Sequence, residues 1–246
     1  MMPIVVEGGI DIGSGITIGG SAGPTPPSLL LELDATDYSG SGSTWTAATG
    51  SNATLFNTPT YTASSPTYFS FNNAQQEYAS TTNLASQSAW TVETWFRVTS
   101  TITPGAGGVI TAVVTDQFNL TTNLNFSIGT NRQPTSANIC VGFWNGAWRT
   151  TNGFAPTLNT WYQVVGTYDG NTIKQYVNNS LDTQLSYTGT SASGGLSLRI
   201  ARRWDSPLTT NNCFPGDVAI VRIYNSAMTA GEVTANWNAD KARFGY

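Results

Sequence analysis

This chain of 246 residues contains no histidine. Histidine is the commonest general base and the commonest metal ligand, so its absence excludes Ser-His and Cys-His nucleophiles. Cys140 and Cys213 are the two cysteines of the sequence, too few for a disulfide scaffold or a four-thiolate zinc site. They form either two buried thiols or one long-range disulfide, and the sequence leaves both alternatives open.

Charge is also scarce, because charged residues make up 10% of the chain and the net charge is −4. The longest basic run is Arg202–Arg203, so no phosphate-binding surface is indicated and we expect no nucleic-acid partner. No apolar run approaches the roughly 20 residues of a membrane-spanning helix. The N-terminus lacks the basic and apolar segments of a signal peptide. We therefore expect no membrane partner.

What the sequence does contain is many small polar residues and 28 aromatic ones, namely eight Trp, ten Tyr and ten Phe. This composition favours short strands and turns over helices. Period-two alternation and continuous apolar runs predict strands within 89–98, 137–151, 161–177, 196–201 and 217–224. Gln175 interrupts the apolar alternation of its strand. In segment 89–98, one face carries Trp90, Val92, Phe96 and Val98, and the other carries Glu93, Trp95 and Arg97.

Two dipeptides predict tight hairpins, Asn145-Gly146 and Asp169-Gly170. A two-residue turn at the first of them places Trp144 opposite Ala147, with Arg149 diagonal on the same face. Val141, Phe143 and Trp148 are then expected on the opposite face, toward the core.

The C-terminus is the one segment with a helical pattern. Thr229 and Glu232 have the spacing of a capping box, in which each side chain satisfies a backbone amide at the helix start. Val233 and Trp237 follow one turn apart on the same face. The sequence therefore predicts one short helix packed on a β-sandwich.

The first 20 residues form a separate arm rich in Gly and Ile. The isoleucines Ile10, Ile12, Ile16 and Ile18 alternate around a Gly-Ser-Gly turn, which predicts two short strands. Residues 21–28 contain three prolines and read as an extended linker. The domain that begins at residue 29 has its own complete strand pattern, so we expect residues 1–20 to pair with another subunit by β-augmentation.

The segment NTWYQVVGTYDGNTIKQYVNN resembles the central hairpin of laminin G-like domains in the concanavalin A-like lectin/glucanase superfamily. The segment SAWTVETWFRV resembles an earlier strand of these domains, and FPGDVAIVRIYNSAMTAGEV resembles their last strand and short helix. The resemblance covers residues 29–246 in order. It implies an all-β, concanavalin A-like jelly-roll sandwich with an N-terminal β-arm and one short C-terminal helix.

The C-terminal run VRIYNSAMTAGEVTANWNADKARFGY behind a Gly/Ile-rich start is also similar to virion structural proteins of tailed phages, especially marine ones. This resemblance implies a non-enzymatic virion protein that decorates the capsid or forms part of a fibre or spike. We expect such a protein to be homo-oligomeric and anchored to capsid or tail proteins through residues 1–20. The alternative is an extracellular carbohydrate-binding lectin module, with or without calcium, and a virion protein could also display a surface that binds host glycans.

Glycosidases, the enzymes known for this type of fold, need two carboxylates that flank the scissile bond. Strand 89–98 supplies only Glu93, while Asp116, Asp205 and Asp217 stand alone in the sequence. We therefore expect no enzymatic activity.

A calcium site needs several oxygen ligands, usually including carboxylates. Asp34 and Asp37 are close in the sequence, but many laminin G-like domains carry adjacent aspartates where this chain has Ala219 and Ile220. We therefore expect no metal or other cofactor.

Glycan binding is predicted from aromatic residues, which stack on sugar rings. Trp144 with Arg149 forms the first candidate platform, at the Asn145-Gly146 hairpin. Trp204 and Asp205, in the loop RRWDSPLTTNN, form the second. The competing interpretation is that the eight tryptophans fill the core or subunit contacts.

Overall fold

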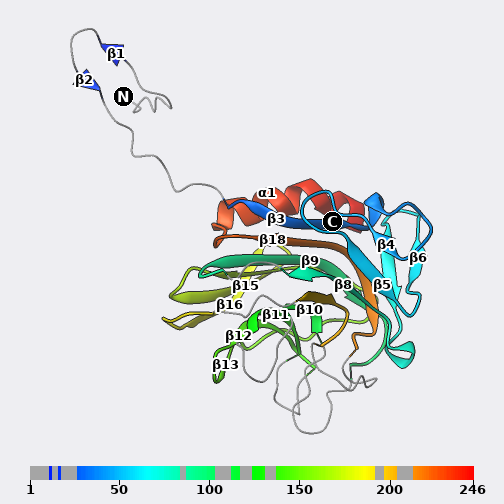
Figure 1. The fold of residues 1–246 in the computed structure, drawn as a ribbon. Coiled ribbons are helices and arrows are strands. Elements are labelled where there is room, and N and C mark those ends of the chain that lie inside the picture. Colours follow the sequence, from blue (N-terminus) through cyan, green and yellow to red (C-terminus); the bar gives the residue numbers. More distant parts are fainter. Residues whose placement is uncertain are drawn as a thin grey trace.

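The protein folds as two large antiparallel sheets packed face to face, with one helix on the outer face of one sheet (Figure 1). The computed structural model describes residues 11–12, 16–17, 27–83, 87–102, 112–116, 124–130, 137–191, 197–203 and 213–246. This architecture confirms the predicted all-β sandwich with a short C-terminal helix.

Sheet I carries the helix. Its spatial order is β16 (Ser180–Ser186), β15 (Thr172–Val177), β14 (Trp161–Tyr168), β9 (Trp90–Val98), β18 (Gly216–Tyr224), β7 (Tyr68–Phe71) and β6 (Thr60–Thr62). The edge of β18 that faces away from β9 is shared by two strands, β7 at its start and β3 (Leu29–Asp34) along the rest.

Sheet II lies opposite. Its order is β13 (Trp148–Thr150), β12 (Ile139–Trp144), β11 (Leu124–Thr130), β10 (Ala112–Asp116), β17 (Ser197–Ile200), β8 (Tyr78–Asn83), β5 (Ala53–Phe56) and β4 (Thr44–Trp45). Short 3-10 turns complete the described elements: η1 (Ala35–Asp37), η2 (Asn73–Gln75) and η4 (Lys241–Phe244).

The main core lies between the sheets and follows the predicted alternation of β9. Trp90, Val92 and Phe96 are fully buried there. The Trp90 ring lies 5.9 Å from Phe126 and 6.4 Å from Phe143 of sheet II, measured between ring centroids. One face of β9 therefore joins the two sheets, as the sequence predicted.

The other face of β9 supports the helix α1 (Ala230–Asp240). Trp95 is fully buried and stacks on Trp237 of α1 at 5.3 Å and on Phe244 of η4 at 4.0 Å between centroids. The helix starts with the predicted capping box, because the Thr229 hydroxyl accepts a bond from Glu232 N–H and the Glu232 carboxylate accepts one from Thr229 N–H. The helix thus adds a second, smaller apolar cluster on the outer face of sheet I.

The N-terminal arm forms the predicted strand pair. β1 (Asp11–Ile12) pairs with β2 (Ile16–Thr17), with Ile12 opposite Ile16. In the described part of the chain this two-stranded sheet is hydrogen-bonded to neither sheet of the sandwich. Ile10 and Ile18, and the side chains of Ile12 and Ile16, lie outside the described residues.

Both predicted hairpins exist, but their loops are longer than two residues. Tyr168 pairs with Ile173, so the loop at Asp169-Gly170 has four residues. The Asp169 carboxylate accepts bonds from the backbone N–H groups of Asn171 and Thr172, which closes the loop. The loop is therefore longer than the tight turn that the dipeptide predicted, and Asp169 organises it.

The structure decides between the two alternatives for the cysteines. Cys140 and Cys213 are both free and buried, so the disulfide alternative was wrong. Burial raises the pKa of the Cys140 thiol to about 12.

In the described part of the chain, α1 is too short and too polar to span a bilayer, and no longer helix is present.

Candidate functional site

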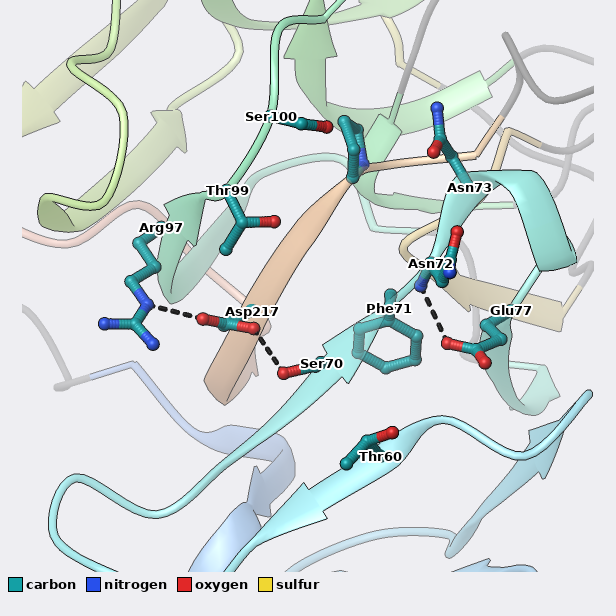
Figure 2. A pocket seen from close by; sticks show the side chains of 11 residues that line it. Thr60, Ser70, Phe71, Asn72, Asn73, Glu77, Arg97, Thr99, Ser100 and Asp217 are labelled. Carbon is teal, nitrogen blue, oxygen red and sulfur yellow. Dashed lines mark hydrogen bonds and ion pairs between the residues drawn. The ribbon is translucent and has the colours of Figure 1, made fainter.

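A polar pocket of about 500 Å³ opens where strands β6, β7, β9 and β18 of sheet I end (Figure 2). Most of the described residues that line it present hydroxyl, amide or charged groups: Thr60, Ser70, Asn72, Asn73, Glu77, Arg97, Thr99, Ser100 and Asp217. Phe71 and Pro215 supply its apolar wall. The four strands and the segments next to them place these side chains together, although the residues are up to 157 positions apart in the sequence.

One side of the pocket is formed by the ion pair between Arg97 of β9 and Asp217 of β18. These residues are direct neighbours in the antiparallel register of the two strands. Arg97 Nε donates to one oxygen of the Asp217 carboxylate, and Ser70 Oγ donates to the other at 2.6 Å (Figure 2). The Asp217 carboxylate is thus held from β9 on one side and from β7 on the other. Its side chain is only 3% exposed.

The Arg97 guanidinium is held on its other side by aromatic rings. Its terminal Nη2 donates to the Tyr68 hydroxyl at 3.0 Å. Its central carbon lies 4.9 Å from the Tyr68 ring centroid and 5.2 Å from the Trp161 centroid. Such cation–π contacts fix the orientation of the guanidinium plane.

Across the pocket, Asn72 and Glu77 brace the short turn η2. Asn72 caps η2 by accepting a bond from Ala74 N–H, and Asn72 N–H donates to the Glu77 carboxylate at 2.7 Å. Burial raises the pKa of Glu77, and the bond from Asn72 N–H opposes this rise. The Asn73 side chain lies beside them (Figure 2). This rigid wall presents hydrogen-bonding groups opposite Arg97 and Asp217.

The sequence singled out Asp217 as an isolated acid and missed the rest of this pocket. Alternation alone places Arg97 on the outer face of β9, but it does not show which residue of a distant strand lies beside it. That pairing depends on the register of β9 against β18, between residues 120 positions apart. The pocket could therefore be found only from the fold.

The first predicted glycan platform is not assembled as expected. Trp144 pairs with Trp148, not Ala147, because the loop 145–147 has three residues and Gly146 alone of the dipeptide has positive φ, +94°. A register shift of one residue exchanges the two faces of a strand. The Trp144 and Trp148 rings therefore meet on one face at 5.4 Å. Arg149 lies opposite Phe143, away from Trp144.

Arg149 has a different aromatic partner from the one predicted. Its guanidinium lies 4.4 Å above the Tyr187 ring. The second platform, Trp204 with Asp205, lies outside the described residues, so its prediction stays open. The hairpin thus carries two separate aromatic pairs where the sequence predicted a single Trp-Arg platform.

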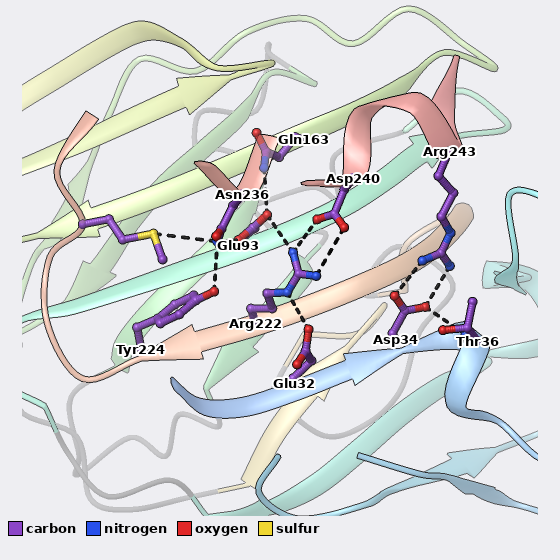
Figure 3. Close-up of polar contacts among 11 residues, drawn as sticks. Glu32, Asp34, Thr36, Glu93, Gln163, Arg222, Tyr224, Asn236, Asp240 and Arg243 are labelled. Atoms are coloured by element: carbon purple, nitrogen blue, oxygen red, sulfur yellow. Dashed lines mark hydrogen bonds and ion pairs between the residues drawn. The ribbon is translucent and has the colours of Figure 1, made fainter. Parts of the chain in front are cut away.

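Glu93, the acid considered for catalysis, is fully buried between sheet I and α1. Its carboxylate accepts bonds from Gln163 and Asn236 at 2.7 and 2.6 Å and lies 3.3 Å from the Arg222 guanidinium (Figure 3). Burial raises the pKa of Glu93, and the charge of Arg222 opposes the rise. This carboxylate therefore contacts other side chains and has no access to a substrate.

One of the two candidate calcium ligands, Asp34, is also engaged in an ion pair. The Asp34 carboxylate accepts two bonds from the Arg243 guanidinium, at 2.6 and 2.8 Å, and one from Thr36 N–H (Figure 3). Asp37 is exposed beside it. Among the residues that the structure describes, no group of three or more acidic or cysteine side chains is arranged to hold a metal ion.

Two facing antiparallel sheets with a jelly-roll order define the class of lectin-like β-sandwiches. The sequence agrees with this class, because residues 71–234 match a laminin G family model described as the concanavalin A-like lectin/glucanases superfamily. The match covers more than half of the chain, and the chain belongs to this superfamily. No curated protein sequence matches it significantly.

Several solved structures share the fold. Domain 4 of AbnA, a GH43 extracellular arabinanase from Geobacillus stearothermophilus solved with arabinotriose, is 17% identical with a TM-score of 0.66, over 86% of this chain and 98% of that domain. The receptor-binding domain of botulinum neurotoxin D is 12% identical with a TM-score of 0.63, over 87% of this chain and 53% of the other.

A sialidase from Trypanosoma rangeli, solved with the inhibitor DANA, is 14% identical with a TM-score of 0.58. The match covers 88% of this chain but 34% of the sialidase. The chain thus spans about half of the neurotoxin domain and a third of the sialidase. At these identities the similarities establish the fold.

Proposed function

We propose that this domain binds carbohydrate without catalysis and that the pocket around Arg97 and Asp217 is the ligand site. The observation that carries the proposal is a pocket of about 500 Å³ in which hydroxyl, amide and charged groups line the wall and a few apolar atoms complete it. Sugars present many hydroxyl groups, each of which both donates and accepts hydrogen bonds, so a wall of mixed donors and acceptors suits them. The arabinotriose complex of AbnA domain 4 supports a sugar-binding role for this type of sandwich.

The pocket is tested by removing hydrogen-bonding groups that hold no other part of the fold. Asn73 is half-buried and Thr99 is exposed, and both line the pocket. We expect the full chain to bind neutral glycans on an array, and the double variant Asn73→Ala/Thr99→Val to bind about 5- to 150-fold more weakly, because each of the two lost bonds is worth about 0.5–1.5 kcal/mol. Isothermal titration calorimetry measures the change.

The matched control is Asn238→Ala, which removes the same side chain from an exposed position on α1. This variant should bind like the wild type. The Trp144→Ala variant tests the hairpin as an alternative site. Loss of binding in Trp144→Ala, with unchanged binding in the pocket double variant, would move the site to sheet II. An array on which the wild type binds no glycan would refute the proposed function.

We also propose that the domain is a virion structural protein anchored by residues 1–20. The observation that supports anchoring through the arm is that β1 pairs with β2 alone in the described chain, while the sandwich from residue 29 onward builds its own core. The virion location rests on the resemblance of the C-terminal run to phage structural proteins. A two-stranded sheet is marginally stable in water, so it gains stability by pairing with further strands. The partners would be capsid or tail proteins, or other copies of this chain, and the alternative location is extracellular.

Deletion of residues 1–27 tests the anchor. We expect the truncated protein to keep its melting temperature, since the core residues begin at Leu31, but to lose co-sedimentation with virus-sized particles. Density-gradient centrifugation with mass spectrometry of the fractions measures the association, and full-length protein in the same preparation is the control. Equal co-sedimentation of both forms would contradict the anchoring role.

A further inference from the structure

The charges of the pocket bear on which glycans it can accept. Its described lining contains one basic side chain, Arg97, and two acidic ones, Asp217 and Glu77. The net charge of the lining is therefore −1 with both acids ionised, and zero with Glu77 protonated. In neither state do the described lining residues offer a net positive charge to an anionic ligand.

The one positive charge of the lining is already compensated. Asp217 accepts a bond from Arg97 Nε, and this carboxylate is 3% exposed and held in place by Ser70 Oγ at 2.6 Å. The guanidinium is also fixed by the Tyr68 hydroxyl and by the rings of Tyr68 and Trp161. A sugar carboxylate approaching Arg97 would meet the negative charge of Asp217 beside it.

The remaining polar groups among the described lining residues are uncharged. Side-chain hydroxyls and amides come from three segments that surround the ion pair: Thr60, Asn72, Asn73, Thr99 and Ser100. Such groups exchange hydrogen bonds with sugar hydroxyls without requiring charge on the ligand. Like-charge contacts, in contrast, disfavour a competing ligand and so create specificity.

We propose that the pocket selects uncharged glycans over sialylated or uronic-acid glycans, and that Asp217 sets this selectivity by compensating the charge of Arg97. This inference rests on the proposed carbohydrate-binding function. It assigns Asp217 as the specificity-determining residue of the site.

The experiment compares neutral oligosaccharides with their terminally sialylated forms on one array, using the full chain. We expect the wild type to bind the neutral member of each pair at least about tenfold more tightly. The variant Asp217→Asn keeps the shape and an acceptor for Ser70 but leaves the Arg97 charge uncompensated. Its preference for neutral glycans should fall by about tenfold, because a charge-assisted bond to the sialic acid carboxylate becomes available.

Two further variants make the result specific. Asp37→Asn makes the same replacement at an exposed position outside the pocket, and it should leave the preference unchanged. The double variant Arg97→Met/Asp217→Asn removes both charges and should regain the preference for neutral glycans. Sialylated binding by Asp217→Asn should also weaken as salt is raised, because the attraction is electrostatic.

The outcomes separate the two proposals. A wild type that binds no glycan refutes the carbohydrate-binding function itself. A wild type that binds neutral and sialylated forms equally leaves that function intact and overturns the selectivity. If Asp217→Asn does not fold, the selectivity is decided by the wild-type ratio and the double variant. A double variant that prefers sialylated glycans contradicts the role assigned to Arg97.

Discussion

Replacement of Arg222 by methionine should lower the free energy of unfolding by about 3–5 kcal/mol. Arg222 lies on β18 and contacts three carboxylates, Glu32 at 2.8 Å, Glu93 at 3.3 Å and Asp240 of α1 (Figure 3). Glu93 has no exposed surface. Without the guanidinium, a fully buried negative charge loses its ion-pair partner, which is far more costly than losing a surface ion pair.

Urea denaturation followed by far-UV circular dichroism measures this loss. Arg222→Lys is the matched control, because it keeps the charge and loses the forked geometry, so it should be less destabilised than Arg222→Met. The double variant Glu93→Gln/Arg222→Met should also lose less than the single one, because the fully buried charge of Glu93 is then absent. A single variant within 1 kcal/mol of the wild type, as expected for a surface pair, would show that the network is unimportant for stability.

The same variant should show a pH dependence of known sign. Burial raises the pKa of Glu93 above its ordinary value of 4.5, so the folded protein binds the proton more tightly than the unfolded chain. The stability associated with the protonated form is fully present below pH 4.5 and is lost as pH rises through the raised pKa. Removal of Arg222 raises the pKa further. The deficit of Arg222→Met relative to the wild type should therefore shrink on acidification from pH 7 toward pH 4.5.

The second large effect is expected for Trp95→Ala, which should cost about 3–5 kcal/mol. Trp95 is fully buried on the outer face of β9, and its ring is nearly parallel to those of Trp237 and Phe244, at interplanar angles of 9° and 12°. Its removal leaves a cavity beneath both α1 and η4. The C-terminal segment should then become sensitive to protease at concentrations that leave the wild type intact.

Trp148→Ala is the matched control for this variant. It removes the same side chain from the edge hairpin, where the tryptophan is half-buried and meets Trp144 edge to face. We expect a smaller loss of stability and no change in protease sensitivity of the C-terminus. Equal losses for both variants would contradict a special role of Trp95 in holding the helix.

The elements found from sequence were those specified by local patterns. The alternation of β9 predicted which side chains face the core, and the capping box at Thr229 predicted where α1 begins. The failures at the candidate sites involve register. One extra loop residue at 145–147 reversed the faces of Trp148 and Arg149, and an isolated Asp217 gained a partner only through the pairing of β18 with β9.

Gln175 shows why an irregular position can still fit a core. It interrupts the apolar alternation of β15, yet it is fully buried. Its amide accepts a bond from the Thr151 hydroxyl at 2.6 Å and donates to the Ile139 carbonyl at 3.1 Å, and both partners lie on the sheet II side of the core. The sequence pattern alone shows such a residue as an exception, because its hydrogen-bond partners are 24 and 36 positions away.

The shared edge of β18 has a mechanical consequence. Residues 27 and 28 lead into β3, whose Leu29 lies opposite Tyr224, whereas Asp217 lies at the other end of β18 beside β7. If the arm is anchored and a ligand is held at Asp217, a pulling force enters β3 at one end and leaves β18 at the other. The β3–β18 hydrogen bonds run perpendicular to the strands, so a force along the strands loads all of these bonds at the same time. The bonds are therefore not broken one by one. A domain tethered and loaded in this way would resist tension along its strongest direction.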